Sequence, residues 1–288
     1  MSDPQVWFVT GSSSGFGRSI VEYVLSQGGI AVATLRKPSA LDDLKAKYPP
    51  SRLLILKLDV TKPQDITNAF DKTKEVFGRI DVVFNNAGYP LVGEIESTTQ
   101  EVARALFEVT FWGADRVAQE AVKFFREVNK PGVGGRLLNV SSSAGLNAYP
   151  GIGYYCASKF ALEALTQALS MELDPAWNIK VTLIEPGAFI TNALTTSLVT
   201  APIHPAYADS QYGSRPVREM FSKVGAGGGD PDKAVKRFYE LARLPDPPLR
   251  FLVGKDAVFH GRDQLQRVQS DLEKYESWSE GLEFDKSS

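Results

Sequence analysis

The residues of this chain best suited to chemistry are a tyrosine and a lysine four positions apart, Tyr155 and Lys159. Side chains at this spacing share one face of a helix, so the ammonium can lie close to the phenol. A free phenol has a pKa of about 10, and a nearby positive charge favours the phenolate and lowers that pKa. Ser142 could add a hydroxyl that binds a substrate oxygen, if the fold brings the two segments together. The alternative is a chance pair on an amphipathic helix.

The length and composition favour small-molecule chemistry in one domain. The 288 residues suffice for a single domain over residues 1–288 with a well-buried core. The formal net charge of −2 argues against a nucleic-acid surface or a basic membrane patch. Two histidines and one cysteine provide no cluster of soft metal ligands and no internal disulfide. Cys156 is either a packing residue or a nucleophile, and without a nearby histidine we expect packing.

No targeting or membrane-spanning segment is predicted. The N-terminus lacks a basic segment followed by an apolar stretch, and no apolar run approaches the roughly 20 residues that span a bilayer. We therefore expect a cytoplasmic protein.

Seven short runs of apolar and β-branched residues predict buried strands. They lie at residues 6–10, 30–35, 53–58, 80–85, 136–141, 181–184 and 250–253, with helical stretches between them. This alternation predicts the doubly wound α/β plan (Rossmann fold), a mostly parallel sheet covered by helices on both faces. Ligands of such a sheet bind beyond the carboxyl ends of the strands. We expect a cofactor-binding part at about 1–150, a catalytic helix and lid at about 151–230, and a C-terminal helix and strand at 231–288.

Residues 192–229 interrupt the alternation, with several prolines and the run Gly225-Ala226-Gly227-Gly228-Gly229. We interpret this insertion as a lid with a glycine hinge, before a helix that begins at Asp230-Pro231, although a decorative surface insertion is the alternative. Its apolar residues suggest a bulky apolar substrate, or else form the small core of the lid itself. They are Leu194, Leu198, Val199, Ile203, Tyr207, Tyr212, Met220 and Phe221. Residues 256–278 predict a solvated helix packed on the sheet edge.

A glycine-rich turn, Thr10-Gly11-Ser12-Ser13-Ser14-Gly15-Phe16-Gly17, follows the first predicted strand and leads into a helical stretch. Glycine permits a tight turn and lets main-chain N–H groups approach a pyrophosphate, which the helix N-terminus then stabilises. The turn therefore predicts a dinucleotide site, with a purely structural turn as the alternative.

The spacing Gly-x-x-x-Gly-x-Gly resembles that of the short-chain dehydrogenase/reductase family, and further blocks follow in that family's order over about residues 6–191. These blocks are Asp59-Val60-Thr61, Asn85-Asn86-Ala87-Gly88, Ser142 thirteen residues before Tyr155, the Tyr155 and Lys159 pair, and Pro186-Gly187 followed by Thr191. The resemblance implies a diphosphate turn, an adenine-binding carboxylate, a contact to the adenosine ribose and a residue that holds the nicotinamide amide. The matching residues of the diphosphate turn are Gly11, Ser13, Gly15, Phe16 and Gly17. Asp59 matches the adenine-binding carboxylate, Asn86 the contact to the adenosine ribose, and Thr191 the residue that holds the nicotinamide amide. Asp59 and Asn86 could instead stabilise local turns.

The end of the second predicted strand distinguishes between cofactors. An acidic residue there would bind the ribose 2′-hydroxyl of NAD, whereas a basic residue accommodates the 2′-phosphate of NADP. This chain has Arg36 and Lys37, and a guanidinium matches phosphate oxygens in a bidentate fork. We expect NADP(H), with NAD(H) less favoured and two solvated charges as the alternative.

The family resemblance also implies a mechanism. Tyr155 donates a proton to a carbonyl oxygen as hydride arrives, Lys159 lowers the Tyr155 pKa and holds the nicotinamide ribose, and Ser142 polarises the carbonyl. The family's usual Asn-x-x-Gly run is replaced by Thr110-Phe111-Trp112-Gly113, which puts the proton relay in doubt. Three outcomes stay open: a working relay with Thr110, a slowed enzyme, or other chemistry.

The leading hypothesis is an NADP(H)-dependent reductase of a ketone or aldehyde, or the reverse alcohol dehydrogenase. An epimerase, dehydratase or non-redox enzyme, or a nucleotide-binding regulatory protein, is the alternative. The family commonly forms dimers and tetramers, so a homodimer or homotetramer is possible.

Overall fold

The computed structural model describes residues 4–191, 197–210, 213–222 and 228–284, and its centre is a sheet of parallel strands. The order across this sheet is β3-β2-β1-β4-β6-β7-β9. Every pairing in it is parallel. The strands are β1 (Val6–Thr10), β2 (Ile30–Leu35), β3 (Leu53–Lys57), β4 (Val82–Asn85), β6 (Gly135–Val140), β7 (Ile179–Pro186) and β9 (Arg250–Val253). The seven predicted runs form these seven strands, so the fold prediction is confirmed.

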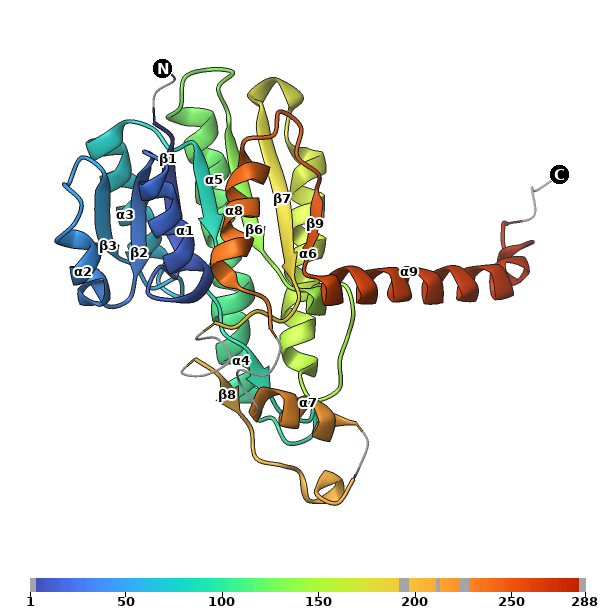
Figure 1. Cartoon of the computed structure of the whole chain (residues 1–288). Coiled ribbons are helices and arrows are strands. Elements are labelled where there is room, and N and C mark those ends of the chain that lie inside the picture. Colours follow the sequence, from blue (N-terminus) through green and yellow to red (C-terminus); the bar gives the residue numbers. More distant parts are fainter. Residues whose placement is uncertain (1–3, 192–196, 211–212, 223–227, 285–288) are drawn as a thin grey trace.

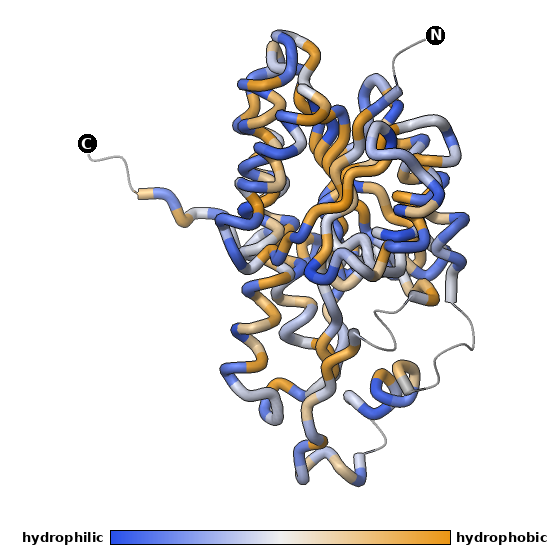
Figure 2. The backbone as a smooth tube through the Cα atoms, turned by 90° about the vertical axis from the view of Figure 1, so that its left-hand side faces the viewer, coloured by the Kyte–Doolittle hydropathy of each residue, from blue (hydrophilic) through white to orange (hydrophobic). Residues whose placement is uncertain are grey.

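Helices cover both faces of the sheet (Figure 1). One face packs against α1 (Gly15–Ser26) and α8 (Pro231–Ala242), and the other packs against α3 (Pro63–Phe77), α5 (Ala114–Glu127) and α6 (Gly153–Glu172). Alternate strand residues point to the two faces, so Trp7 and Val9 enter one core cluster and Val6 and Phe8 the other. Figure 2 shows the hydrophobic residues concentrated in these central strands.

The strand order reverses between β1 and β4. From β1 the chain proceeds outward through β2 and β3, and from β4 it proceeds the other way through β6, β7 and β9. The carboxyl ends of β1 and β4 therefore flank a crevice, which is where ligands of doubly wound sheets bind.

Short elements surround the carboxyl edge of the sheet. They are η1 (Pro38–Leu41), α2 (Asp42–Lys45), α4 (Gln100–Phe107), the π-helical η2 (Glu108–Gly113), η3 (Ser143–Gly145), η6 (Pro205–Tyr207) and α7 (Ser214–Ser222). At the opposite edge, η4 (Pro175–Trp177) directly precedes β7. Two strands that the sequence did not predict, β5 (Leu91–Val92) and β8 (Val199–Thr200), form a separate parallel pair. This pair joins the segment after β7 to the loop after β4.

The C-terminal helix corrects one prediction. α9 (Lys255–Tyr275), followed by η7 (Glu276–Ser279), projects away from the body and does not pack along the sheet edge (Figure 1). Only its first turns contact the body, where Ala257 and Gly261 are buried. A Cβ on Gly261 would lie 2.5 Å from Leu252 Cδ2, so a small residue is needed for this contact. Within the described ranges, no helix combines the length and apolarity needed to cross a bilayer.

Candidate active site

A cavity of about 1200 Å³ lies at the carboxyl ends of the central strands. Its walls come from segments far apart in the sequence: the glycine turn, the ends of β2 and β3, the loops after β4 and β6, the first turns of α6, and α7. The cavity therefore occupies the crevice at the reversal of strand order, as the sequence predicts.

The glycine turn fits a pyrophosphate. Gly15 has a φ of +53°, which favours glycine, and a Cβ on Gly17 would lie only 2.3 Å from the Gly11 carbonyl oxygen. Ser14 is the N-cap of α1, but its side chain makes no capping hydrogen bond. The first main-chain N–H groups of the helix therefore remain available to donate hydrogen bonds to a ligand. Ser13 lines the cavity.

Two other predicted cofactor residues lie against this turn. The Asn86 side-chain amide donates to the Thr10 carbonyl at 3.0 Å. Asn86 therefore stabilises the glycine turn, in line with the alternative that it has a local structural role. A Cβ on Gly15 would lie 3.2 Å from Thr191 Cβ, which places Thr191 beside the start of α1. Phe16 lines the cavity but also packs edge-on against Phe189, so part of its role is structural.

The structure brings Asp59 and Arg36 together at one end of the cavity. Asp59 Oδ1 accepts hydrogen bonds from the Thr61 N–H at 3.0 Å and from Thr61 Oγ1 at 2.8 Å. Burial raises the pKa of Asp59, but these bonds and the charge of Arg36 outweigh burial, so the net pKa is below its ordinary value. Arg36 is exposed and lines the cavity. Lys37 is exposed and does not line the cavity.

Ser142, Tyr155 and Lys159 meet on the opposite wall. Tyr155 and Lys159 come from the first turns of α6, and Lys159 Nζ lies 5.8 Å from the centroid of the Tyr155 ring. The buried ammonium donates to the Val140 carbonyl at 2.9 Å. Ser142 Oγ accepts from the Ala144 N–H at 3.1 Å, which leaves its own O–H to donate, and the Ser142 and Tyr155 side chains share a hydrogen bond.

The pKa of Tyr155 differs from the sequence-based expectation. Burial raises it to about 12, and the hydrogen bond with Ser142 offsets only part of this rise. Burial also lowers the pKa of Lys159 to about 8, against the opposing charge of Glu163. The net pKa of Tyr155 therefore lies above its ordinary value, because desolvation of the phenolate outweighs the hydrogen bond from Ser142.

Thr110 lies near Lys159, but its hydroxyl faces elsewhere. A Cβ on Gly88 would lie 3.6 Å from the Thr110 methyl carbon and 3.9 Å from Lys159 Nζ, so the two side chains flank Gly88. The Thr110 hydroxyl donates to the Leu106 carbonyl at 2.7 Å, back along its own helix. Thr110 belongs to the π-helical turn η2, a deviation that is common at functional sites.

Sequence reasoning missed a buried cluster next to this wall. Glu163 Oε1 accepts from Ser141 Oγ at 2.6 Å, and Glu163 Oε2 accepts from Arg250 at 2.5 Å. Arg250 also donates to Glu185 Oε1 at 2.8 Å, whereas Glu185 Oε2 is buried without a partner. Burial, aided by the charge of Glu163, raises the pKa of Glu185 to about 7. The available signal was the carboxylate four residues after Lys159.

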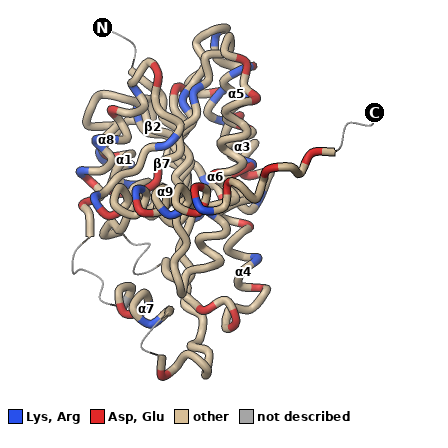
Figure 3. The backbone as a smooth tube through the Cα atoms, turned by 90° about the vertical axis from the view of Figure 1, so that its right-hand side faces the viewer, with Lys and Arg blue, Asp and Glu red and all other residues tan. Residues whose placement is uncertain are grey.

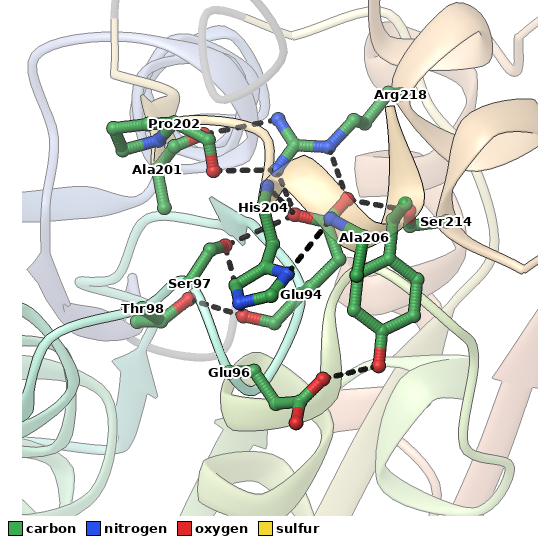
Figure 4. Close-up of polar contacts among 11 residues, drawn as sticks. Glu94, Glu96, Ser97, Thr98, Ala201, Pro202, His204, Ala206, Ser214 and Arg218 are labelled. Atoms are coloured by element: carbon green, nitrogen blue, oxygen red, sulfur yellow. Dashed lines mark hydrogen bonds and ion pairs between the residues drawn. The ribbon is translucent and has the colours of Figure 1, made fainter. Parts of the chain in front are cut away.

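A second missed network fastens α7 to the loop after β5 (Figure 4). The buried Glu94 carboxylate accepts from Arg218 at 2.8 and 2.6 Å and from Ser214 Oγ at 2.5 Å. The Arg218 guanidinium, with help from Ser214, holds the pKa of Glu94 well below its usual range. The exposed Glu96, labelled in Figure 4, accepts a hydrogen bond from the Tyr207 hydroxyl. These partners are more than 100 residues apart in the chain, and no local pattern connects them.

Part of the segment interpreted as a lid lies against the cavity. Val199, Met220 and Phe221 line the cavity, and Leu198 packs against the small apolar cluster behind it. Ile203 and Tyr207 are exposed and do not line the cavity, whereas Leu194, Tyr212 and residues 225–227 lie outside the described residues. The predicted start of α8 is confirmed, because Asp230 accepts from the N–H groups of Asp232 and Lys233.

The two residues next to Tyr155 in the sequence do not belong to the cavity lining. Cys156 is buried in an apolar cluster and burial raises the pKa of its thiol, so it packs as expected. Tyr154 lies outside the cavity lining, with its hydroxyl 3.5 Å from Gln100 Nε2. Two residues that the sequence did not single out, Tyr149 and His260, line the cavity in edge-on contact.

Known proteins resemble this chain along nearly its full length. The sequence model described as short chain dehydrogenase matches residues 5–200. An uncharacterized oxidoreductase of Schizosaccharomyces pombe is 40% identical over 92% of this chain and 87% of its own length. The oxidoreductase calM of Penicillium decumbens is 39% identical over 95% and 91%. A 3-ketodihydrosphingosine reductase of Bacteroides thetaiotaomicron is 32% identical over 87% and 88%.

Solved structures agree. A short-chain dehydrogenase from Streptomyces avermitilis superposes with a TM-score of 0.88 and 36% identity, covering 99% of this chain and 100% of its own. More distant structures share the fold: one from Burkholderia phymatum in complex with NAD (TM-score 0.78, 21% identity, coverage 93% and 95%) and one from Burkholderia cenocepacia in complex with NADP (0.73, 22%, 94% and 97%). The matched length and the placement of the cavity leave one conclusion: this chain belongs to the short-chain dehydrogenase family of oxidoreductases.

Proposed function

We propose that this protein is an NADP(H)-dependent oxidoreductase that interconverts a ketone or aldehyde with an alcohol. One observation carries the proposal: a hydroxyl, a phenol and a buried ammonium from Ser142, Tyr155 and Lys159 form one wall of a cavity whose other wall is the glycine turn. An acid group therefore faces the place where a dinucleotide would bind.

The residues that line the cavity fit a nicotinamide dinucleotide. The close approach at Gly17 and the uncapped start of α1 suit the pyrophosphate, while Asp59 and Thr191 lie at positions suited to its two ends. When bound, this cofactor supplies or accepts a hydride at the carbon that is reduced or oxidised.

The protein's own groups handle the proton. In the direction of reduction, the Tyr155 phenol donates its proton to the carbonyl oxygen, and the Ser142 O–H turns from Tyr155 to donate a hydrogen bond to the same oxygen. A pKa of about 12 keeps Tyr155 protonated before the reaction. A pKa of about 8 leaves most of Lys159 charged at pH 7, so its ammonium stabilises the negative charge that develops on the phenol oxygen.

Arg36 supports the choice of NADP(H). It is the basic residue that follows β2, it lines the cavity, and its positive charge lowers the pKa of Asp59. We expect a higher kcat/KM with NADPH than with NADH, and a selective loss of the NADPH activity, roughly tenfold or more, in Arg36→Ala. Lys37→Ala is the matched control and should change little. A preference for NADH that survives Arg36→Ala overturns the NADP(H) assignment.

The substrate is proposed to be bulky and apolar, with α7 and its neighbours acting as a lid. Val217, Met220 and Phe221 of α7 line the cavity together with Ile152 and Val199. A lipid-like or polycyclic ketone fits such a lining. The relative from Bacteroides thetaiotaomicron, whose name specifies a 3-ketodihydrosphingosine reductase, makes a long-chain ketone a sensible first member of the test panel.

The direct test follows NADPH absorbance with a panel of carbonyl compounds. Tyr155→Phe should lower kcat at least about a hundredfold, because it removes only the ionisable hydroxyl. Tyr154→Phe, next in sequence but outside the cavity, is the control and should retain activity. Product formation without net NADPH consumption would favour an epimerase or dehydratase, and NADPH binding without turnover would favour a regulatory protein; either result overturns the proposal.

A further inference from the structure

The projecting helix α9 carries an exposed apolar stripe that nothing in the described chain covers. Its members recur at alternating intervals of three and four residues: Val258, Gly261, Leu265, Val268, Leu272 and Tyr275. The first members lie near the body, and Gly261 is buried against it. Beyond the edge of the body the stripe is open, and Leu265 and Leu272 are 65% and 62% exposed. Stable monomers rarely expose such a continuous apolar face.

The spacing of the stripe identifies the kind of surface that fits it. Apolar residues at alternating three- and four-residue intervals form the seam between two helices packed knobs-into-holes. A twofold contact pairs a surface with itself, so a second copy of this chain presents the same seam in the required form. We propose that α9 is a self-association surface, through which two copies of this protein pair their C-terminal helices antiparallel.

The distribution of charge favours this occupant and this orientation. The first half of α9 carries Lys255 and Arg262 beside Asp256 and Asp263, so its charges balance; Asp263 pairs with Arg267, just past the middle, and Asp256 accepts from the Ala188 N–H. Acidic residues outnumber basic ones from the middle of α9 onward: Asp271, Glu273, Glu276, Glu280 and Glu283, with Arg267 and Lys274 among them. Figure 3 shows acidic segments along the chain that leads from α9 toward the C-terminus. A parallel pair would bring the two acidic ends together, whereas an antiparallel pair places each acidic end beside the charge-balanced half that carries Lys255 and Arg262.

An antiparallel seam also aligns particular residues. With Leu265 opposite Tyr275 of the second copy and Val268 opposite its Leu272, all four open members of the stripe are covered. Arg262 then lies beside Glu276 of the second copy, on the flank of the seam, and symmetry provides this pair twice. Asp271 meets its own counterpart near the twofold axis, so this single repulsive contact is set against the two Arg262–Glu276 pairs.

The pairing accounts for a further exposed side chain. Trp278, in η7 just beyond the helix, is 76% exposed. In the antiparallel arrangement it reaches the base of α9 in the second copy, where that helix joins its body. A membrane surface is a poorer occupant, because the acidic half of α9 would be repelled by anionic lipids.

The first experiment measures the oligomeric state of the full chain by sedimentation and light scattering. We expect a concentration-dependent dimer in the wild type. Leu265→Glu with Leu272→Glu should raise the dimer dissociation constant at least about tenfold, because it buries charge in the seam. Gln266→Glu with Ser270→Glu adds the same charge on the opposite face of α9 and should leave the dimer intact. Circular dichroism checks that both variants are folded.

The second experiment tests the orientation and needs no disruption of the seam. Gln269 lies on the flank close to the proposed axis, so Gln269→Cys should form a disulfide-linked dimer on mild oxidation. Ser270→Cys, the adjacent position on the outer face, should not. The only native cysteine, Cys156, is buried and gives a clean background.

The proposal is overturned by a wild type that stays monomeric up to high micromolar concentration, or by a dimer that both double-glutamate variants retain. Equal cross-linking at positions 269 and 270 overturns the antiparallel orientation. Sedimentation of a monomer with vesicles of phosphatidylcholine and phosphatidylserine would identify a membrane surface and would also overturn the proposal.

Discussion

Glu163 accepts a 2.6 Å hydrogen bond from the hydroxyl of Ser141, the residue directly before Ser142. The same carboxylate lies one helical turn after Lys159, and its negative charge raises the pKa of that lysine against the larger, opposite effect of burial. Its second oxygen accepts from Arg250, which also binds Glu185. One buried carboxylate thus binds the serine segment and keeps the neighbouring lysine protonated up to a higher pH.

The first prediction concerns the pH dependence of activity in Glu163→Gln. The amide keeps an acceptor for Ser141 but removes the charge that raises the pKa of Lys159, so the lysine loses its proton at lower pH. The alkaline fall in kcat/KM, expected near pH 8 in the wild type, should move down by about half a unit or more. Glu172→Gln, at the exposed end of the same helix, is the control. A lower rate with an unchanged pH profile would mean that Glu163 is only structural.

The second prediction concerns stability and Glu185. Because its pKa is raised from 4.5 to about 7 in the folded protein, the folded state binds more protons than the unfolded state between these values. The contribution of Glu185 to the unfolding free energy is therefore present below the lower pKa and is lost as the pH rises through about 7.

Glu185→Gln should remove this dependence. The wild type should lose on the order of 1–3 kcal/mol relative to the variant between pH 5 and pH 8, measured by urea unfolding at both values. Other groups titrate in both proteins, so the difference between the two is the relevant quantity. Parallel pH dependence in wild type and variant would contradict the raised pKa.

Local patterns explain why much of the fold could be predicted. A buried parallel strand has a nearly continuous run of apolar residues. Such a run is visible in Val6–Thr10 and in Arg250–Val253 without knowledge of the strands that lie beside them. The glycine turn and the Tyr155 and Lys159 spacing are also contained within a few residues. By contrast, β5 and β8 have two residues each and depend on pairing across more than 100 positions, so no periodicity marks them.

The site residues that the sequence missed act through tertiary contacts. Glu94 looks like any loop carboxylate until Arg218, 124 residues later, reaches it. The Tyr155 pKa moved opposite to expectation because spacing indicates a nearby charge but does not indicate how much water the fold removes. The α9 stripe was interpreted as packing on the sheet edge because its periodicity reveals an apolar face without identifying its partner.

The third prediction tests the buried attachment of α7. Glu94→Gln removes the ion pair with Arg218 while keeping the side-chain shape, so α7 should open more often over the cavity. We expect the KM for a bulky apolar carbonyl to rise roughly fivefold to tenfold, with a smaller change in kcat. Glu96→Gln removes an exposed contact to Tyr207 and should change KM less than about twofold. Equal effects of the two substitutions would contradict a special role for Glu94.

The last prediction addresses the proton path behind Lys159. Because the Thr110 hydroxyl donates to Leu106 and its methyl group faces Gly88, the side chain presents no hydroxyl oxygen toward the ammonium. Thr110→Val keeps the shape and removes the hydroxyl, so turnover should stay within about threefold of the wild type, measured with saturating NADPH. A loss of roughly tenfold or more would show that the hydroxyl takes part in the relay. Thr110→Asn supplies the complementary test. A many-fold rise in turnover with every carbonyl tried would show that threonine limits the rate. No rise would leave the main chain of the π-helical turn as the group that orients water near Lys159.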